Sequence, residues 1–533
     1  MKAVNYEALS PILFLERSAR IYKNKVAIID RECKKTYQEF FIDCITLAKA
    51  FKKLGLSAND KVAYLCRNTI HMLEAHYAVP MLGGVLVPIN TRLNPIEVNY
   101  ILKHSDAKVL VIEADFMDSL YEETMEKIFI ISDSENNNSE KKYSNYKELI
   151  GLSCDDETHF INHILDEEAA ITLNYTSGTT GNPKGALYSH RSAYLNAMGE
   201  CLEVGLNKNS VYLWVLPMFH CNGWCFTWAV TAVGATHICM NSFKAENAID
   251  LILHHKVTHF CAAPTVLSML LTAKNFMRLK ETQGLTVITA GSSPAPQLIK
   301  NYHNVGVNII HVYGLTETHG PHTICPPDDE VSFLDHKACS LKALQGFSSL
   351  HGMFTRVVDN NMKDVPPDST SIGEVVMRGN NVMRGYYKDP ANTEVAFKEG
   401  WFHSGDLAVV HLDGTIEIKD RIKDIIISGG EKISSIEIEN VIYQLPEVLF
   451  VAVIASPDEE WGEVPHAIIE LKEGWSLVEQ DVKSHCRAHL AHFKCPKIIT
   501  FQPIPKTTTG KIQKYLLRKC NVTTDNVYSI VQE

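Results

Sequence analysis

The chain has 533 residues, of which 45% are hydrophobic and 21% are charged. This balance is typical of a folded globular protein and argues against intrinsic disorder. The formal net charge is -11, and no run of Lys or Arg marks a surface for polyanions, so we expect no nucleic-acid partner. The length is too great for one core, and it predicts a large multi-lobed domain with at least one smaller domain.

The N-terminal part alternates helical periodicity with short apolar runs, a pattern typical of α/β units. The first candidate strands are residues 61–65, 85–89 and 108–112. Residues 132–142 are rich in turn-forming residues and predict an exposed loop between two lobes. The alternation then resumes, with further candidate strands at residues 169–175, 257–261 and 286–290.

Membrane, export and disulfide signals are weak along the whole sequence. The longest apolar stretch, residues 225–240, is shorter than a membrane span and predicts buried core. An apolar signal segment and a peroxisomal C-terminal address are not recognised, so we expect a cytoplasmic location. The fourteen cysteines include no C-x-x-C pair, which predicts reduced thiols rather than a zinc site.

The character of the sequence changes near residue 420, where a densely charged turn over residues 419–424 precedes a new apolar run. We place a domain boundary there, with residues 1–420 as a large domain and residues 421–533 as a small α+β domain.

Two spacings in the small domain predict helix starts. Ser434 with Glu437, and Ser476 with Glu479, each place a hydroxyl three residues before a carboxylate. This is the capping-box spacing, in which the two side chains satisfy backbone N–H groups reciprocally.

The most informative segment is residues 175–185, a loop of hydroxyls, glycines and one lysine that follows an apolar strand. Glycines let backbone N–H groups approach an anion, and Lys184 supplies positive charge for a polyphosphate. A Walker A loop is excluded because Pro183 precedes this lysine and Gly185 follows it. The alternative is a Gly/Thr-rich surface turn without a ligand. The candidate phosphate-binding residues are Thr176, Ser177, Gly178, Thr179, Thr180 and Lys184.

Residues 175–185 resemble the phosphate loop of the adenylate-forming superfamily, which includes acyl-CoA synthetases, luciferases and peptide-synthetase adenylation domains. Further motifs of that superfamily follow in order at residues 313–318, 400–407, 420–424 and 505–511. The resemblance implies an α/β fold. Its large N-terminal domain combines α/β sheets with a small β-rich lobe, and its small α+β C-terminal domain is mobile. ATP, Mg²⁺, coenzyme A and a carboxylic acid are the implied ligands.

For the nucleotide, the resemblance implies that Tyr313 presents an aromatic face to adenine, opposite a turn at residues 291–294. Asp406 would accept hydrogen bonds from the ribose hydroxyls, with Arg421 assisting. Outside the motif, Asp406 and Arg421 would each be interpreted as part of a surface ion pair. The implied nucleotide-binding residues are Gly291, Ser292, Ser293, Tyr313, Gly314, Asp406 and Arg421.

For the chemistry, the resemblance implies that Glu317 supplies an oxygen to the magnesium ion that accompanies ATP. Lys511 matches the lysine that reaches from the small domain to the substrate carboxylate and the α-phosphate, where a cation stabilises developing charge. Lys423 stands at the hinge about which the small domain rotates between the two half-reactions. The implied catalytic residues are Lys511, Glu317, Thr316 and His220, with Glu317 as the metal ligand.

After that rotation, Gly429 and Gly430 would face the coenzyme A channel, where missing side chains leave room for the thiol arm. His220 would lie at the mouth of the acyl pocket, and Trp224 would limit its depth, which favours a short or modest acyl chain. Core packing is the alternative for both residues. The implied acyl-pocket residues are His220, Trp224, Gly291, Gly314 and Pro321.

Residues 216–224, with 5–17 and 79–86, resemble the acyl-activating branch that acts on short- and medium-chain or aromatic acids. We therefore expect an ATP-dependent acid–CoA ligase, with the oligomeric state open. The alternatives are a fatty acyl-AMP ligase that delivers to a carrier protein, a catalytically silent nucleotide-binding protein and a luciferase-like oxidase. Two departures affect loop geometry and substrate choice: Ser369 replaces a usual glycine, and residues 337–352 match the branch only loosely.

Overall fold

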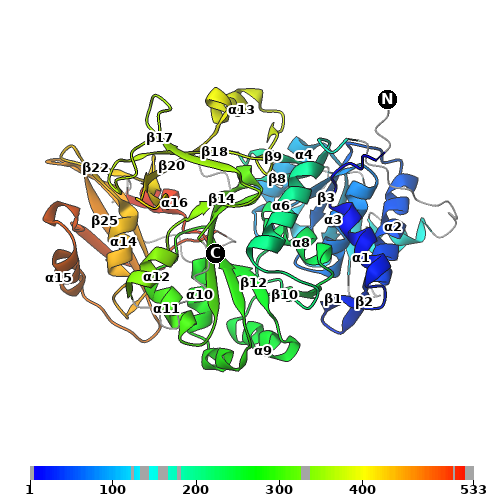
Figure 1. Ribbon diagram of the computed structural model, residues 1–533, viewed down its shortest axis with the longest axis horizontal. Helices are drawn as coiled ribbons and strands as arrows, with labels where there is room; N and C mark the ends of the chain where they lie inside the picture. Colours follow the sequence, from blue (N-terminus) through cyan, green and yellow to red (C-terminus); the bar gives the residue numbers. More distant parts are fainter. Residues whose placement is uncertain are drawn as a thin grey trace.

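The computed structural model describes residues 5–121, 125, 127–132, 143–153, 166–176, 182–325, 336–507 and 510–521. Four sheets organise this part of the chain, and Figure 1 shows them following one another from the N-terminal lobe on the right to the C-terminal helices on the left. Residues 133–142, most of the loop expected between two lobes, lie outside the described residues.

An eight-stranded sheet forms the N-terminal lobe, in the order β19-β9-β8-β4-β3-β5-β6-β7. Its strands are β3 (Lys61–Leu65), β4 (Val85–Pro88), β5 (Ala107–Glu113), β6 (Ile128–Ile131), β7 (Ser144–Asn145), β8 (Ala170–Tyr175), β9 (Gly185–Ser189) and β19 (Gly385–Tyr386). The accompanying helices are α2 (Tyr37–Lys53), α3 (Ile70–Met81), α4 (Pro95–Ser105), α5 (Tyr146–Gly151) and α6 (His190–Glu203). The candidate strands at 61–65, 85–89, 108–112 and 169–175 are confirmed, because each apolar run is buried in this sheet.

A nine-stranded sheet follows, in the order β16-β15-β14-β13-β12-β10-β11-β1-β2, with parallel pairing at its centre. Its strands are β1 (Val26–Asp30), β2 (Cys33–Thr36), β10 (Val211–Leu213), β11 (Thr236–Cys239), β12 (His259–Ala262), β13 (Thr286–Thr289), β14 (Asn308–Leu315), β15 (Gly320–Ile324) and β16 (Phe347–Ser348). Its helices are α1 (Ile12–Ile21), α8 (Phe226–Ala232), α9 (Ala245–His255), α10 (Pro264–Leu271), α11 (Pro296–His303) and α12 (His336–Lys342), and the short segment α7 (Cys221–Trp224) is a left-handed turn.

The apolar stretch 225–240 becomes α8, β11 and their connection within this second lobe, and its large side chains are buried. The prediction of buried core is confirmed. Across the described ranges, the search for a helix long and apolar enough to cross a membrane finds none.

A smaller antiparallel sheet, in the order β17-β18-β20-β21, forms the β-rich lobe expected from the resemblance. It contains β17 (Phe354–Val358), β18 (Gly373–Arg378), β20 (Phe402–Val410) and β21 (Ile416–Arg421), with α13 (Pro390–Ala396) nearby. Short 3₁₀ turns occur at Ala114–Ser119, Phe276–Glu281, Thr316–Thr318, Lys398–Gly400 and His492–Lys494.

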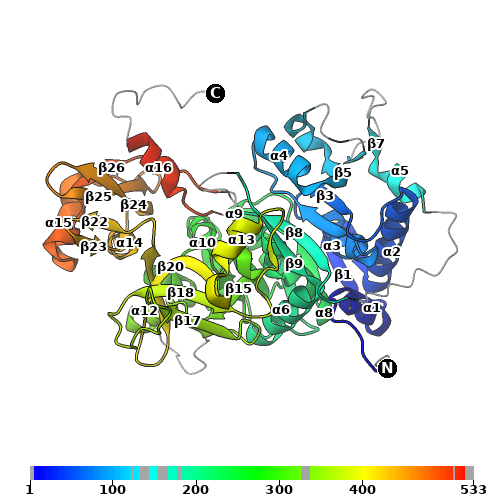
Figure 2. The same ribbon diagram turned by 90° about the horizontal axis from the view of Figure 1, so that it is seen from above.

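The last sheet belongs to a C-terminal unit that Figure 2 shows as a separate body at the left. This unit contains β22 (Ile426–Ser428), β23 (Glu431–Ile433), β24 (Val448–Asp458), β25 (Gly462–Leu471), β26 (Ile498–Phe501), α14 (Ser435–Ile442), α15 (Glu479–His489) and α16 (Lys514–Asn521). Its apolar side chains form cores of their own, and the mixed α/β fold class with a large N-terminal part is confirmed. The domain boundary at residue 420 stays a prediction.

Three local predictions near this unit need correction. The prediction of a charged turn over residues 419–424 is wrong for its first half, because strand β21 continues to Arg421 and pairs there with β20. Ser434 does cap α14, but Glu437 binds Lys494 at 2.8 Å instead of completing the box. The predicted capping box at Ser476 is wrong, because α15 begins after Val478. Acidic residues in the first turn of α15 stabilise this end through the helix dipole instead.

Candidate active site

The β14–β15 hairpin forms the centre of the site and carries the motif at residues 313–318. Gly314 pairs with Pro321, and a Cβ atom at Gly314 would lie 1.9 Å from the carbonyl oxygen of Gly320. No side chain fits at that distance, so glycine permits the close approach of the two strands. The tip, Thr316–Thr318, is thereby held against the strands that follow.

Glu317 projects from this tip toward β19. Its Oε1 accepts a hydrogen bond of 2.7 Å from the Tyr386 hydroxyl, and its backbone oxygen accepts one from Met383 N. In the described ranges, no group of three or more His, Cys, Asp or Glu side chains has the arrangement of a protein metal site. A metal at Glu317 would therefore take its remaining ligands from phosphates and water, as magnesium commonly does.

Tyr313, Asp406 and Arg421, the three residues expected around adenine and ribose, come together. The Tyr313 hydroxyl donates to Asp406 Oδ2 at 2.7 Å, and Arg421 Nε lies 3.2 Å from Asp406 Oδ1. Asp406 and Arg421 are register partners on β20 and β21. Burial and the neighbouring Asp406 raise the pKa of Tyr313 well above its usual value, so its hydroxyl stays a donor.

The turn at Gly291, Ser292 and Ser293 is held through a residue that the sequence did not single out. Gln345 Nε2 donates to Ser293 Oγ at 2.7 Å, and its Oε1 accepts from Ile418 N at 2.6 Å. Gln345 thus links this turn to β21. It lies in the segment 337–352 that matches the branch only loosely, so no motif marked it.

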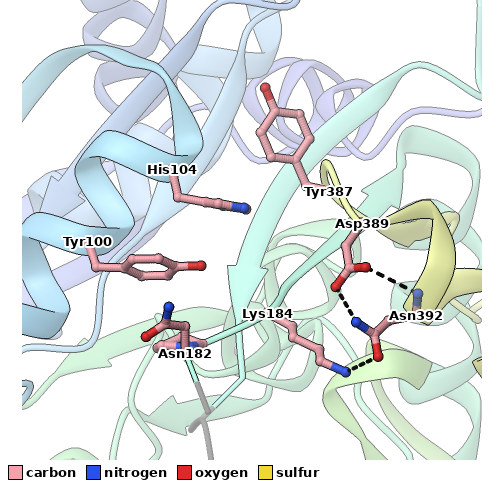
Figure 3. Close-up of a pocket in the computed structure, with 8 residues that line it drawn as sticks. Tyr100, His104, Asn182, Lys184, Tyr387, Asp389 and Asn392 are labelled. Carbon is pink, nitrogen blue, oxygen red and sulfur yellow. Dashed lines mark hydrogen bonds between the residues drawn. The ribbon is translucent and has the colours of Figure 1, made fainter.

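The described ends of the phosphate loop are Thr176 and Lys184, whereas Ser177, Gly178, Thr179 and Thr180 lie outside the described residues. The Lys184 amine donates to Asn392 Oδ1 at 2.8 Å and lies 5.0 Å from the ring centroid of Tyr386. The amine lines a cavity of about 430 Å³. Figure 3 shows its hydrogen bond to Asn392, which is bonded in turn to Asp389. The cavity is lined by Tyr100, His104, Asn182, Pro183, Lys184, Tyr387, Asp389 and Asn392.

Lys511 reaches the same site from the C-terminal unit. Its pKa is lowered to about 7, first by the positive charge of Arg421 and then by burial. Asp406 and Glu317 act in the opposite direction, so both carboxylates lie within electrostatic reach of the amine. The structure thus brings together the lysine, the ribose-binding pair and the carboxylate at the hairpin tip.

The loop that carries Lys511 is packed closely against α10. A Cβ atom at the preceding residue, Gly510, would lie 2.1 Å from Thr265 Oγ1. Gly510 also has a φ of 84°, a conformation that favours glycine. Glycine therefore lets the C-terminal unit insert this loop into the large unit.

His220 and Thr316 lie near the same group of charges. Burial, followed by the positive charge of Lys511, lowers the pKa of His220 to about 4, so His220 is neutral at pH 7. Its neighbour Cys221 has its Sγ 3.8 Å from Thr316 Oγ1. His220 therefore adjoins the hairpin tip, to which Thr316 itself belongs.

A run of left-handed backbone follows His220. Five successive residues, Cys221–Cys225, have φ between 45° and 64°. Left-handed conformations cost roughly 1–2 kcal/mol for each residue other than glycine, so this turn needs specific support.

Asn222, fully buried, supplies that support. Its Oδ1 accepts from Thr172 Oγ1 at 2.8 Å and from Asn174 Nδ2 at 2.6 Å. Its Nδ2 donates to His76 Nε2 at 2.9 Å, because His76 Nδ1 already faces the backbone oxygen of Met72. Thr172 and Asn174 belong to β8, so Asn222 joins the acyl-pocket turn to the strand that enters the phosphate loop.

Pro321 and Trp224 were both expected in the acyl pocket; Pro321 lies in β15 of the hairpin, and Trp224 packs against the hairpin at Gly320. Trp224 is 5% exposed, and its Cα would lie 3.1 Å from a Cβ atom at Gly320. Trp224 also belongs to the main hydrophobic core, so packing against the hairpin accounts for its burial. Its role in limiting pocket depth remains a prediction.

The hinge and channel residues lie on the C-terminal side of the site. The pKa of Lys423 is lowered, mainly by burial and then by Arg421. Gly429 and Gly430 form the turn between β22 and β23, and a Cβ atom at Gly429 would lie 2.7 Å from the Trp461 ring. Their hinge and channel roles stay predictions.

Comparison with known proteins places this geometry in a family. Residues 15–387 match the AMP-binding enzyme model, and residues 437–511 match the model of the AMP-binding enzyme C-terminal domain. The chain is 45% identical to 4-hydroxybutyrate–CoA ligase 2 of Metallosphaera sedula, over 96% of this chain and 94% of the relative. It is 40% identical to acetate–CoA ligase CCL3 of Humulus lupulus, over 97% and 95%.

Among solved structures, the anthranilate CoA ligase AuaEII in complex with anthranoyl-AMP aligns with a TM-score of 0.86. The identity is 26%, and the alignment covers 98% of this chain and 99% of the other. One family model covers the site residues up to residue 387 and the other covers Lys511, while the alignments with the two relatives extend over nearly the whole chain. The chain therefore belongs to the AMP-binding enzyme family, in the acid–CoA ligase branch of the adenylate-forming superfamily.

Proposed function

We propose that this enzyme activates a short-chain carboxylic acid with magnesium-bound ATP and transfers the acyl group to coenzyme A. The observation that carries the proposal is the position of Lys511, which lies within electrostatic reach of Asp406, Glu317 and His220 although it comes from the C-terminal unit. This arrangement suits the first half-reaction, in which charge develops between a carboxylate and a phosphate.

In the first half-reaction, a carboxylate oxygen of the acid attacks the α-phosphorus of ATP and pyrophosphate leaves. Lys511 would offset the negative charge on the attacking carboxylate and the α-phosphate, and Lys184 would bind the departing phosphates. Glu317 would hold a magnesium ion, which supplies charge neutralisation for the triphosphate. Asp406 would fix the ribose, so positioning and charge account for the step without a protein nucleophile.

In the second half-reaction, the coenzyme A thiol attacks the acyl carbonyl, and AMP leaves with the oxygen that joined it to the acyl group. Lys423 would allow the C-terminal unit to rotate and withdraw Lys511. The Gly429–Gly430 turn would then come to the thiol channel, where missing side chains leave space for the thiol arm.

The short-chain assignment rests on two observations. The relatives reported above act on 4-hydroxybutyrate and acetate, as their names state. The turn behind His220 is closed by Trp224, whose backbone packs on Gly320. A bulky residue at this point suits a small acyl group.

The test measures ATP- and acid-dependent pyrophosphate release for acids from acetate to decanoate, with benzoate and cinnamate added, in the presence and absence of coenzyme A. We expect acyl thioester formation with acids of about two to six carbons and at least a 100-fold loss of adenylation in Lys511→Ala. Pyrophosphate release without thioester formation would point to a carrier-protein acceptor. Preference for decanoate or cinnamate would contradict the short-chain assignment.

A further inference from the structure

The segment that contains β19 and α13, residues 385–396, passes beside the amine of Lys184. Figure 3 shows the Lys184 side chain reaching from the phosphate loop to Asn392 near the start of α13. The Lys184 amine donates to Asn392 Oδ1 at 2.8 Å. The superfamily motifs mark Lys184 but not Asn392, and the reaction described above does not use Asn392.

Asp389 fixes the orientation of the Asn392 amide. As the N-terminal cap of α13, its Oδ1 accepts from Asn392 N at 3.1 Å, and its Oδ2 accepts from Asn392 Nδ2 at 2.7 Å. Because its amino group is bonded to this carboxylate, Asn392 turns its carbonyl oxygen toward Lys184. The amide is therefore held at both of its ends.

The group that Lys184 contacts is neutral, although a carboxylate lies next to it. Both oxygens of Asp389 are directed at Asn392, so the carboxylate holds the amide and not the ammonium group. A lysine ammonium has three donors, and the bond to Asn392 uses one of them. The positive charge of Lys184 is therefore not neutralised by direct pairing with Asp389.

The same segment also supports Glu317. The Tyr386 hydroxyl, on β19, donates to Glu317 Oε1 at 2.7 Å, and the Tyr386 ring centroid lies 5.0 Å from Lys184 Nζ. Burial and then Glu317 raise the pKa of Tyr386, so its hydroxyl stays a donor. One tyrosine thus contacts both the lysine and the carboxylate between which the phosphates of ATP are expected to bind.

Backbone contacts join this segment to the sheet that carries the phosphate loop. β19 pairs with β9, and Tyr387 N donates to the backbone oxygen of Gly185 at 2.7 Å. On α13, Thr393 Oγ1 accepts from Tyr386 N at 2.9 Å and so ties the helix to β19. The segment is therefore fixed relative to Lys184, which directly precedes β9.

We propose that Asn392 is a positioning residue for Lys184, which it holds where the terminal phosphates of ATP bind. This inference rests on the proposed function. A neutral acceptor suits this role because it orients the ammonium group without competing for its charge. Lys184, Asp389 and Asn392 all line the cavity of about 430 Å³, so a phosphate can reach the amine without displacing Asn392.

The opposite role would be to hold Lys184 away from the phosphates until ATP arrives. The two roles differ in the sign of one effect. Removal of a positioning contact weakens polyphosphate binding, because the lysine side chain must then be ordered when the ligand binds. Removal of a contact that competes with the ligand strengthens polyphosphate binding.

The first test measures acid-dependent ATP–pyrophosphate exchange in Asn392→Ala, with Glu394→Ala as the matched control at an exposed position of the same helix. We expect KM for ATP and for pyrophosphate to rise about 10-fold in Asn392→Ala, with KM for the acid unchanged. The control should behave as wild type. Unchanged or lowered KM values for ATP and pyrophosphate would overturn the inference.

A second readout separates positioning from folding. The thioester half-reaction, started from preformed acyl-adenylate and coenzyme A, involves no polyphosphate, so Asn392→Ala should keep its rate within about 2-fold of wild type. An equal loss in both half-reactions would assign Asn392 a structural role and refute the inference. If Asn392→Ala does not fold, the nearly isosteric Asn392→Asp provides the comparison. Its carboxylate would pair with Lys184 and compete with the phosphates, so KM for pyrophosphate should again rise.

Calorimetric titration with ATP needs no turnover and separates this inference from the proposed function. We expect Asn392→Ala to bind ATP about 10-fold more weakly than wild type, whether or not an acid supports exchange. Equal ATP affinities would overturn the inference. A wild-type enzyme that binds ATP but activates no acid would instead refute the proposed function.

Discussion

Asn222 shows how one side chain supports a conformation that the backbone disfavours. Asparagine tolerates left-handed φ better than most residues, and its amide presents two acceptor sites and two donors. Here the Oδ1 receives hydrogen bonds from Thr172 and Asn174, and Nδ2 donates to His76. The turn that carries His220 is therefore positioned by a buried network rather than by regular secondary structure.

We predict that Asn222→Ala lowers the free energy of unfolding by about 2–4 kcal/mol, because it leaves several buried partners unsatisfied. It should also reduce kcat/KM for the acid more than the affinity for ATP, since the turn borders the acyl pocket. Chemical denaturation and steady-state kinetics would measure both effects.

Asn222→Asp is the informative control for this prediction. Aspartate keeps the shape and both acceptor sites but loses the donor to His76, which is neutral because burial lowers its pKa to about 4. We expect a loss of stability at least as large as in the alanine variant, because aspartate buries a carboxylate and turns an oxygen toward the acceptor nitrogen of His76. If both variants unfold like wild type, the network does not hold the turn.

At the scale of elements, the β14–β15 hairpin depends on one glycine. We predict that Gly314→Ala reduces the adenylation rate by 100-fold or more, because the added methyl group collides with the Gly320 carbonyl oxygen and displaces Glu317 at the tip. Rapid-quench measurement of acyl-adenylate formation would test this.

Gly151→Ala is a matched control for the hairpin variant. A Cβ atom at Gly151 would meet no other atom within 4 Å, and its φ is ordinary. Its adenylation rate should equal that of wild type. Normal activity in Gly314→Ala would show that the hairpin adjusts without moving Glu317.

Elements marked by local patterns were predictable from the sequence, and elements set by distant partners were not. Continuous apolar runs such as residues 61–65 and 286–290 identified buried strands correctly. A strand that is buried on both faces needs apolar side chains at successive positions, so its signal is local in the sequence. The Ser476 capping box failed because spacing alone does not establish where a helix begins. Ser369 adopts a φ of 64°, a conformation that favours glycine, which is the residue that the resemblance leads us to expect there.

For the site, motifs identified Tyr313, Asp406 and Arg421, which the structure brings together. They did not reveal Gln345 or Asn222, because the partners of these residues lie far away in the sequence.

At the scale of the whole molecule, the site is complete only when the C-terminal unit is docked. Lys511 then lies close to Arg421, and this like charge is the largest cause of its lowered pKa, about 7 against an ordinary 10.5. Above pH 7 the amine is therefore mainly neutral in the docked enzyme without nucleotide. The triphosphate of bound ATP would favour the charged form and raise the pKa again.

We predict from this that ATP binding takes up a proton, with little uptake at pH 6 and an approach to one proton at pH 8. The sign follows because the amine is already charged below its lowered pKa and gains its proton on binding only above it. Isothermal titration calorimetry in buffers of different ionisation enthalpy would count the protons, and Lys511→Met should remove the uptake. Equal uptake in wild type and variant would place the titrating group elsewhere. No uptake at pH 8 would show that Lys511 keeps its ordinary pKa before ATP arrives, so that docking of the C-terminal unit follows nucleotide binding instead of preceding it.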